Sequence, residues 1–240
     1  MKKKLTASVL CLALLLIMLL GSTLAWFTDE SGTTNTMTVG NVKIQQNETD
    51  ASGAAFVQNQ HMYPAVIKTL TGGKIATEAN DLWVDAHINN EITKIVTVEN
   101  IGSEAAYVRT LFAFEMKKVG DDQWVDPIGT DVILNHTGIE PTGITITVDS
   151  TKYAVYVCKY ADALDKGETS DSSLRQFYLA SHVGNEFFDQ VGAQYDILVL
   201  SQAVQKAGFD TAADAFNAAL PLNVDNLTAW FTPFAPTPNP

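Results

Sequence analysis

The chain has 240 residues and an acidic composition, with 15 lysine and arginine residues against 27 aspartate and glutamate residues and a formal net charge of −12. This length fits one domain that can bury a sizeable core by itself, and two cysteines do not make a disulfide framework. The negative charge argues against nucleic acid as a partner and against adhesion to anionic polymers without bridging cations.

The first 25 residues have the organisation of a secretory signal peptide. Three lysines at positions 2–4 precede an almost unbroken apolar run at residues 10–20, and small residues then lead to Ala25. We predict cleavage after Ala25 or Trp26, so that the secreted chain begins at Trp26 or Phe27, with a membrane involved only during export. The alternative is a retained membrane anchor, because the uncharged stretch after the lysines is long enough to span a bilayer. Cleavage leaves 12 basic against 27 acidic residues, a net charge of −15.

Residues 26–44 form the leading segment of the mature chain. A polar stretch with two aromatic residues at its tip comes first, and such a chain end rarely packs firmly. Apolar residues then fall at odd positions before Gly40 and at even positions after it, so we expect a β-bulge there. Either this segment pairs with the sheet edge of a neighbouring copy, or it is the first strand of its own domain. The candidate polymerisation residues are Met37, Val39, Gly40, Val42 and Ile44.

Residues 37–200 have the pattern of an antiparallel β-sandwich. Short runs of β-branched and aromatic residues are separated by Gly, Asn, Asp and Pro. Apolar residues recur at every second position in residues 108–116 and 144–148, so each of these strands shows one face to a core. Residues 118–124 are expected to form a hairpin. The predicted fold class is all-β, a jelly-roll-like antiparallel sandwich that occupies residues 26–220.

Short helices are expected near the C-terminal end of this domain. Residues 210–220 place alanine and phenylalanine at three- and four-residue spacing behind a capping residue, and the proline that follows ends the helix. Residues 201–206 predict a second helix. Residues 221–240 are rich in proline and are expected to form an extended or disordered tail. The aromatic residues of this tail could instead dock on the domain; they are Trp230, Phe231 and Phe234.

Cys158 and Arg109 are two residues on predicted strands whose roles can be predicted from their neighbours. Cys158 alternates with apolar residues on a strand-like run, so we expect a small buried side chain rather than a reactive thiol. Arg109 is expected to point outward and to form a salt bridge on its strand, the alternative being a contact with the next subunit.

Motifs in several parts of the chain carry a family resemblance. Leu24–Asp29 is followed by Asn35–Ile44, which reads N-T-apolar-x-x-G-x-apolar-x-apolar. Residues 95–109 contain a strand, an Asn-x-Gly turn and a strand opening Y-V-R. Further motifs lie at residues 195–197, 202–205 and 208–209. With these motifs the chain resembles the TasA/camelysin family over most of its length. The resemblance implies a dedicated signal peptidase and fibres built by passing an N-terminal strand to the next subunit.

Camelysin is described as a metallo-endopeptidase, which needs three converging zinc ligands, usually with two on one helical face. The histidines lie more than twenty residues apart and form no His-Glu-x-x-His motif. His182 and Glu186 have helical spacing but no third ligand. We therefore expect no enzyme activity, no metal site and no cofactor. Acidic loops near Asp121, Asp122 and Asp126 are expected to be solvated, because they lack the spacing of a calcium loop.

Together with the export signal, the resemblance to the TasA/camelysin family implies a secreted structural subunit of extracellular matrix or biofilm fibres at a bacterial cell surface. Its expected partner is another copy of itself in a head-to-tail homopolymer, and other matrix or anchoring proteins could join. Two alternatives remain: a camelysin-like surface metallo-endopeptidase, and a monomeric surface binding module. The binding module would present a tryptophan on a flat face, the candidates being Trp83, Trp124 and Trp230.

Overall fold

The computed structural model describes residues 28–32, 35–37, 42–67, 88–121, 123–191 and 195–234. The predicted signal peptide and its cleavage residues Ala25, Trp26 and Phe27 lie outside this part of the chain. Within it, no helix is long and apolar enough to cross a membrane.

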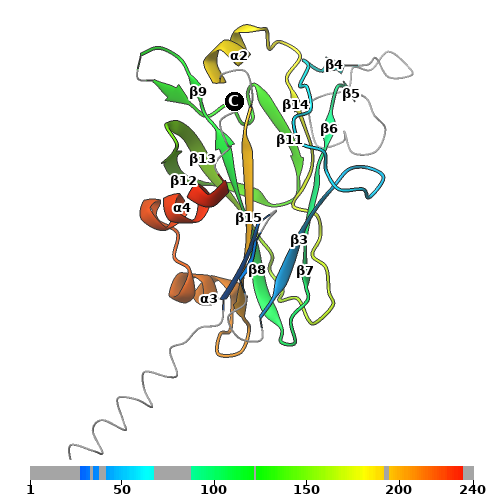
Figure 1. Ribbon diagram of the computed structural model, residues 1–240, viewed down its shortest axis with the longest axis vertical. Coiled ribbons are helices and arrows are strands. Elements are labelled where there is room, and N and C mark those ends of the chain that lie inside the picture. The colour runs from blue at the N-terminus through cyan, green and yellow to red at the C-terminus, as the bar shows by residue number, and fades with distance from the viewer. Residues whose placement is uncertain are drawn as a thin grey trace, which may run out of the picture.

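The fold is a sandwich of two antiparallel β layers (Figure 1). One layer is a six-stranded sheet in which every pair of neighbouring strands is antiparallel. Its order from edge to edge is β12 (Ile139–Val148), β13 (Thr151–Lys159), β8 (Ala106–Glu115), β15 (Ile197–Gln205), β1 (Thr28–Gly32) and β2 (Asn35–Met37).

The second layer combines two smaller sheets. They are β11 (Val132–His136), β14 (Leu174–Leu179) and β6 (Ile92–Thr93), and the pair β7 (Ile95–Asn100) and β3 (Ile44–Thr49). Backbone hydrogen bonds join them, because Lys94 donates to Arg175 and Ser173 donates to Val96. Smaller elements lie outside the two layers: β4 (Val66–Ile67) paired with β5 (Ile88–Asn89), β9 (Lys117–Lys118) paired with β10 (Trp124–Val125), and helix α2 (Glu186–Val191).

Strand β8 lies at the centre of the core, and all ten of its residues are buried. On the face toward the second layer, the rings of Phe112 and Phe114 stack with centroids 5.8 Å apart. They pack against Val96, Leu174 and Phe177 of the opposite layer. Each such side chain stabilises the fold by about 1.5–3 kcal/mol when fully buried, so the two layers are held together mainly by apolar contacts.

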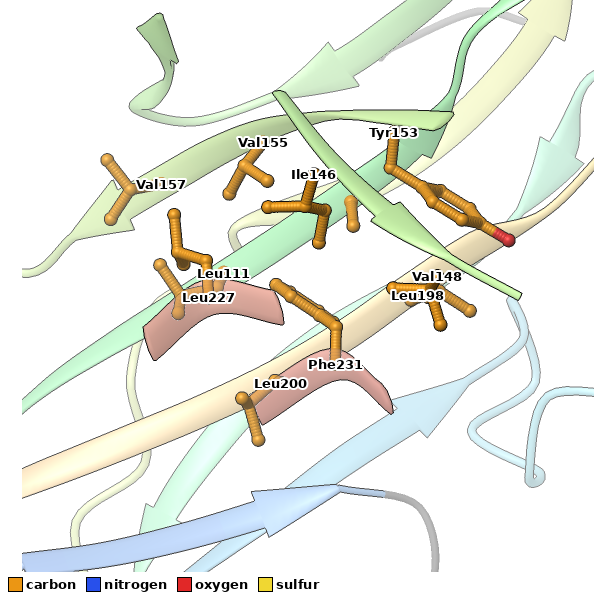
Figure 2. Close-up of a cluster of buried hydrophobic side chains, with 11 residues drawn as sticks. Leu111, Ile146, Val148, Tyr153, Val155, Val157, Leu198, Leu200, Leu227 and Phe231 are labelled. Carbon is orange, nitrogen blue, oxygen red and sulfur yellow. The ribbon is translucent and has the colours of Figure 1, made fainter. Parts of the chain in front are cut away.

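The other face of the six-stranded sheet is covered by α3 (Ala212–Ala219), α4 (Val224–Phe231) and the 3-10 turn η2 (Thr232–Phe234) (Figure 1). Thr211 caps α3 by accepting from the Asp214 backbone, and Asn223 caps α4 by accepting from Asn226. Figure 2 shows Leu227 and Phe231 of α4 directed into a cluster of buried side chains from the sheet. The labelled sheet residues are Leu111, Ile146, Val148, Tyr153, Val155, Val157, Leu198 and Leu200.

The predicted antiparallel sandwich with short C-terminal helices is confirmed, as are the hairpin at residues 118–124 and the helix at 210–220. The helix predicted at residues 201–206 is wrong, because residues 201–205 are the second half of β15. This strand is buried on both faces, so its apolar residues do not alternate and the local pattern resembles a helix. The extended tail is also wrong for residues 224–234, because their aromatic side chains dock on the apolar sheet. Residues 235–240 lie outside the described chain.

Candidate strand-exchange site at the edge of β15

The first described residues of the chain complete the edge of the six-stranded sheet. Strand β1 pairs with β15 along four residues, from Thr28 opposite Val204 to Ser31 opposite Ser201. Strand β2 folds back on β1 as a short hairpin partner. In Figure 1 the dark-blue β1 lies beside β15. Because β15 has only β8 and β1 as neighbours, removal of the β1–β2 hairpin would expose the backbone N–H and C=O groups of β15 as an unpaired edge.

The chain enters the core of the sandwich immediately after this hairpin. Val42 and Ile44 are fully buried among Val98, Val108 and other apolar residues, and Ile44 opens β3 opposite Asn100 of β7. These two predicted polymerisation residues therefore belong to the chain's own core. Met37 ends β2, while Val39 and Gly40 lie outside the described residues. Only four residues, 38–41, separate the hairpin from the firmly packed part of the chain.

The inner face of β15 carries a buried polar row beside the hairpin. Ser201 donates to Gln46 Oε1 of β3 at 2.7 Å, and its hydroxyl lies 3.1 Å from that of Thr110 on β8. Ser201 and Thr110 are both fully buried. Because unsatisfied buried hydroxyl groups are costly, these contacts fix β15 against the second layer whether or not β1 is in place.

Arg109 is buried on the opposite, outer face of the sheet, so its predicted outward orientation is wrong. Its Nε and Nη2 donate to Gln202 Oε1 at 2.9 and 2.6 Å, and Nη2 also donates to the Leu220 carbonyl oxygen at 2.6 Å. The guanidinium lies 4.4 Å from the ring centre of Phe216 in α3 and 5.8 Å from that of Trp230 in α4. A long cationic side chain can cover an apolar surface in this way, and here it joins β8 and β15 to the C-terminal helices.

Two neighbouring acidic residues, Glu115 and Asp196, lie at the C-terminal end of β8. Glu115 is buried, and its Oε2 accepts from the Asp196 backbone N–H at 3.0 Å. Burial raises the pKa of Glu115 to about 8, the hydrogen bond from the Asp196 backbone opposes this rise, and the charge of Asp196 adds to it. Burial also raises the pKa of Asp196. The sequence gives little indication that Glu115 and Asp196 lie together, because each is a single acidic residue beside an apolar strand.

The described histidines do not fit a zinc-peptidase site. His136 Nδ1 accepts from the Ile139 backbone at 3.2 Å, and burial lowers the pKa of His136. His182 precedes α2 rather than lying on it, and its Nε2 is 3.5 Å from Asp131, which also pairs with Lys117. Within the described ranges, no three His, Cys, Asp or Glu side chains are grouped so that they could hold a metal ion. His87 lies outside these ranges.

Two other sequence candidates have structural contacts. Cys158 is buried as expected, and burial raises the pKa of its thiol to about 11. Asp126 accepts from the Ile128 backbone and from the Tyr156 hydroxyl, so its carboxylate is part of the packing beneath β10 rather than a solvated loop charge. Asp121 is exposed, and Asp122 lies outside the described residues.

The fold and the β15 edge define a class of protein. It is an all-β sandwich whose six-stranded sheet is completed by the β1–β2 hairpin, which lies close in sequence to the predicted export signal. Residues 1–65 match the profile of the family described as Camelysin metallo-endopeptidase. The resemblance to the TasA/camelysin family is thereby confirmed over that part of the chain, which contains β1, β2 and β3. No curated protein and no solved structure matches the chain.

Proposed function

We propose that this chain is a secreted, non-enzymatic structural subunit of an extracellular fibre. In the proposed fibre, the β1–β2 hairpin of one copy completes the β15 edge of the next copy. The observation that carries the proposal is the position of the β1–β2 hairpin, which forms one edge of the six-stranded sheet, covers β15 through β1, and is followed after a short connection by the buried Val42.

Exchange of such a hairpin between copies has a low thermodynamic cost. The same backbone hydrogen bonds to residues 201–204 form whether β1 comes from the same chain or from a neighbour. The hairpin and the β15 edge are different surfaces, so the contact is heterologous and extends into a filament unless rotation closes a ring. Because Val42 and Ile44 are in the core, the donated part ends before Val42, and the proposed donor is shorter than the predicted residues 26–44.

Export fits the same proposal, whereas the charge of the mature chain opposes assembly. A signal peptide that is removed outside the cell would leave the hairpin close to the new N-terminus, so assembly would begin only after secretion. The mature net charge of −15 makes copies repel one another. Other matrix or anchoring proteins could cap or attach the fibre, and nucleic acid is not a proposed partner.

The two alternatives have less support. The family description includes a metallo-endopeptidase, but the described His residues have separate contacts and no common ligand group. A binding module would present an exposed tryptophan, whereas Trp124 and Trp230 are half-buried and Trp230 packs against the α4 cluster. Trp83 lies outside the described residues.

A mixture of two variants, each with one added cysteine, tests whether β1 pairs between copies. Ser31 and Ser201 are direct partners in the β1–β15 register, so one batch carries Ser31→Cys and the other Ser201→Cys. The native Cys158 is buried and is present in both batches. Mild oxidation of the mixture is expected to give a covalent dimer containing one chain of each kind, alongside fibres in negative-stain micrographs.

The matched control replaces Ser31→Cys by Ser103→Cys, which lies on an exposed turn away from the edge. This control is expected to give no specific dimer with the Ser201→Cys batch. If the Ser31→Cys mixture also gives none, and the mature protein stays monomeric at all concentrations, strand exchange is not the function of this hairpin.

A further inference from the structure

A belt of polar side chains crosses the interior of the sandwich and ends beside the proposed exchange site. Thr110 of β8 and Ser201 of β15 are opposite each other on neighbouring strands, and their hydroxyl oxygens are 3.1 Å apart. Ser201 donates to Gln46 Oε1 of β3 at 2.7 Å, and Gln46 Nε2 donates to Glu48 Oε1 at 2.8 Å. Glu48 in turn accepts from Lys94. These residues, which come from both layers, form one chain of hydrogen bonds that we call the polar belt.

The polar belt lies on the side of the sandwich that β1 covers. Ser201 is at one end of the β1–β15 register, opposite Ser31, and Gln46 lies across from it on β3. Strand β1 lies close to β3 as well as beside β15 (Figure 1). When the hairpin leaves, water therefore gains access to the space between β15 and β3, and hence to the belt.

The belt occupies positions that face the core. Ile44, Gln46 and Glu48 share one face of β3, and Ile44 is fully buried. Elsewhere the two layers meet through apolar side chains such as Phe112. The side chains of Lys94 and Glu48 are only 7 and 8 % exposed, and burial of a charged pair costs hydration. Tight packing of the layers does not require polar residues here, so the belt calls for another explanation.

A polar belt changes the balance between the covered and the vacant β15 edge. Polar and charged groups lose hydration when β1 covers them, and hydrogen bonds within the belt offset this loss only in part. They regain hydration when the hairpin leaves. An apolar belt of the same shape would have the opposite effect, because its side chains would be exposed to water in the vacant state. The polar belt therefore favours the vacant edge relative to an apolar one.

We propose that the polar belt stabilises the vacant β15 edge in water, and that it thereby sets the rate at which the hairpin of one copy is replaced by that of a second copy. The proposal rests on the strand exchange put forward above. It makes Gln46 and Ser201 the residues that control release of the hairpin, through the hydration of the edge that the hairpin uncovers.

The test replaces the contact between Gln46 and Ser201 by apolar groups in the mature protein. The double variant carries Gln46→Leu and Ser201→Ala, so both partners of this hydrogen bond are removed together and neither is left without the other. Glu48 keeps its pair with Lys94. The matched control is Gln45→Leu, because Gln45 lies on the same strand but is exposed.

Amide hydrogen exchange at residues 201–204 reports release of the hairpin, because these residues pair with β1. We expect exchange there to become about tenfold slower in the double variant, a change of about 1.4 kcal/mol, and to change less than about twofold in Gln45→Leu. A general loss of stability can only speed this exchange, so slower exchange is specific to the proposal. Unchanged or faster exchange in the double variant would overturn it. If the double variant does not fold, the same criterion applies to Ser201→Ala alone, with slowing of about threefold expected.

Mixing of copies separates this proposal from the strand exchange on which it rests. Two populations with different fluorescent labels are combined, and energy transfer is followed as copies enter common fibres. We expect the double variant to mix about tenfold more slowly than the unsubstituted protein. If the unsubstituted copies do not mix, strand exchange fails, yet slower amide exchange within one chain would still support control of hairpin release by the belt. If both proteins mix at the same rate, control by the belt fails while strand exchange stands.

Discussion

Substitution of Phe231 tests whether helix α4 is an integral cover of the sheet. Phe231 is fully buried, and its ring enters the cluster formed by the outer face of β8, β13 and β15 (Figure 2). Phe231→Ala removes this ring and leaves a cavity, which costs about 3–5 kcal/mol in the free energy of unfolding. For a domain of this size, 1 kcal/mol corresponds to about 2–4 °C in Tm, so Tm is expected to fall by about 6–20 °C.

The assay is thermal and urea unfolding of the mature protein followed by circular dichroism. Val224→Ala is the matched control, because Val224 begins the same helix but is 52 % exposed. It is expected to change the free energy of unfolding by less than about 0.5 kcal/mol. A loss below about 1 kcal/mol for Phe231→Ala would refute this reasoning, because the sheet would then be stable without the α4 contact.

Three further predictions concern titration, charge and capping. Burial raises the pKa of Glu115 from its ordinary value of 4.5 to about 8 in the folded protein. The contribution of its neutral form to the stability of the fold is therefore fully present below pH 4.5 and is lost as the pH rises toward 8. Glu115→Gln is therefore expected to raise Tm at pH 8 and to leave it nearly unchanged at pH 4, and an equal shift at both values would contradict this. The mature chain carries a net charge of −15, and salt screens the repulsion between copies. Light scattering is therefore expected to show faster assembly when the salt concentration rises from about 0.01 M to about 1 M. A rate of assembly that is independent of salt would show that charge repulsion does not limit it. Asn223→Ala removes the cap of α4 and is expected to cost about 1 kcal/mol in urea unfolding, with a cost below about 0.3 kcal/mol showing that the cap is not needed.

Local sequence patterns were sufficient for three elements, although β8 is buried on both faces and not on one as expected. The alternation of residues 108–116 predicted β8, and the Gly-Asp turn after residue 118 predicted the β9–β10 hairpin. The spacing of alanine and phenylalanine after Thr211 predicted α3 together with its cap. In each case the side-chain period or the turn chemistry is set by residues close together in the chain.

The same patterns failed where burial is decided by distant segments. Residues 201–205 read as helical because β15 is covered on both faces, by the second layer on one side and by α3 on the other. The proline-rich composition after residue 220 suggested an extended tail, yet Leu227 and Phe231 are fully buried. An amphipathic segment of eight residues has little stability alone, so its fate depends on an apolar surface that the local sequence does not contain.

The sequence by itself determined the all-β class, the candidate export signal, the acidic charge and the resemblance carried by its N-terminal motifs. Only the tertiary structure placed Val42 and Ile44 in the core, brought Arg109 to Gln202 across 93 positions of the chain, and put β1 on the edge of β15. The physical reason is that periodicity fixes which face a residue occupies within its own strand. Strand order and register, which decide the partner across the sheet, arise from long-range pairing of the whole sandwich.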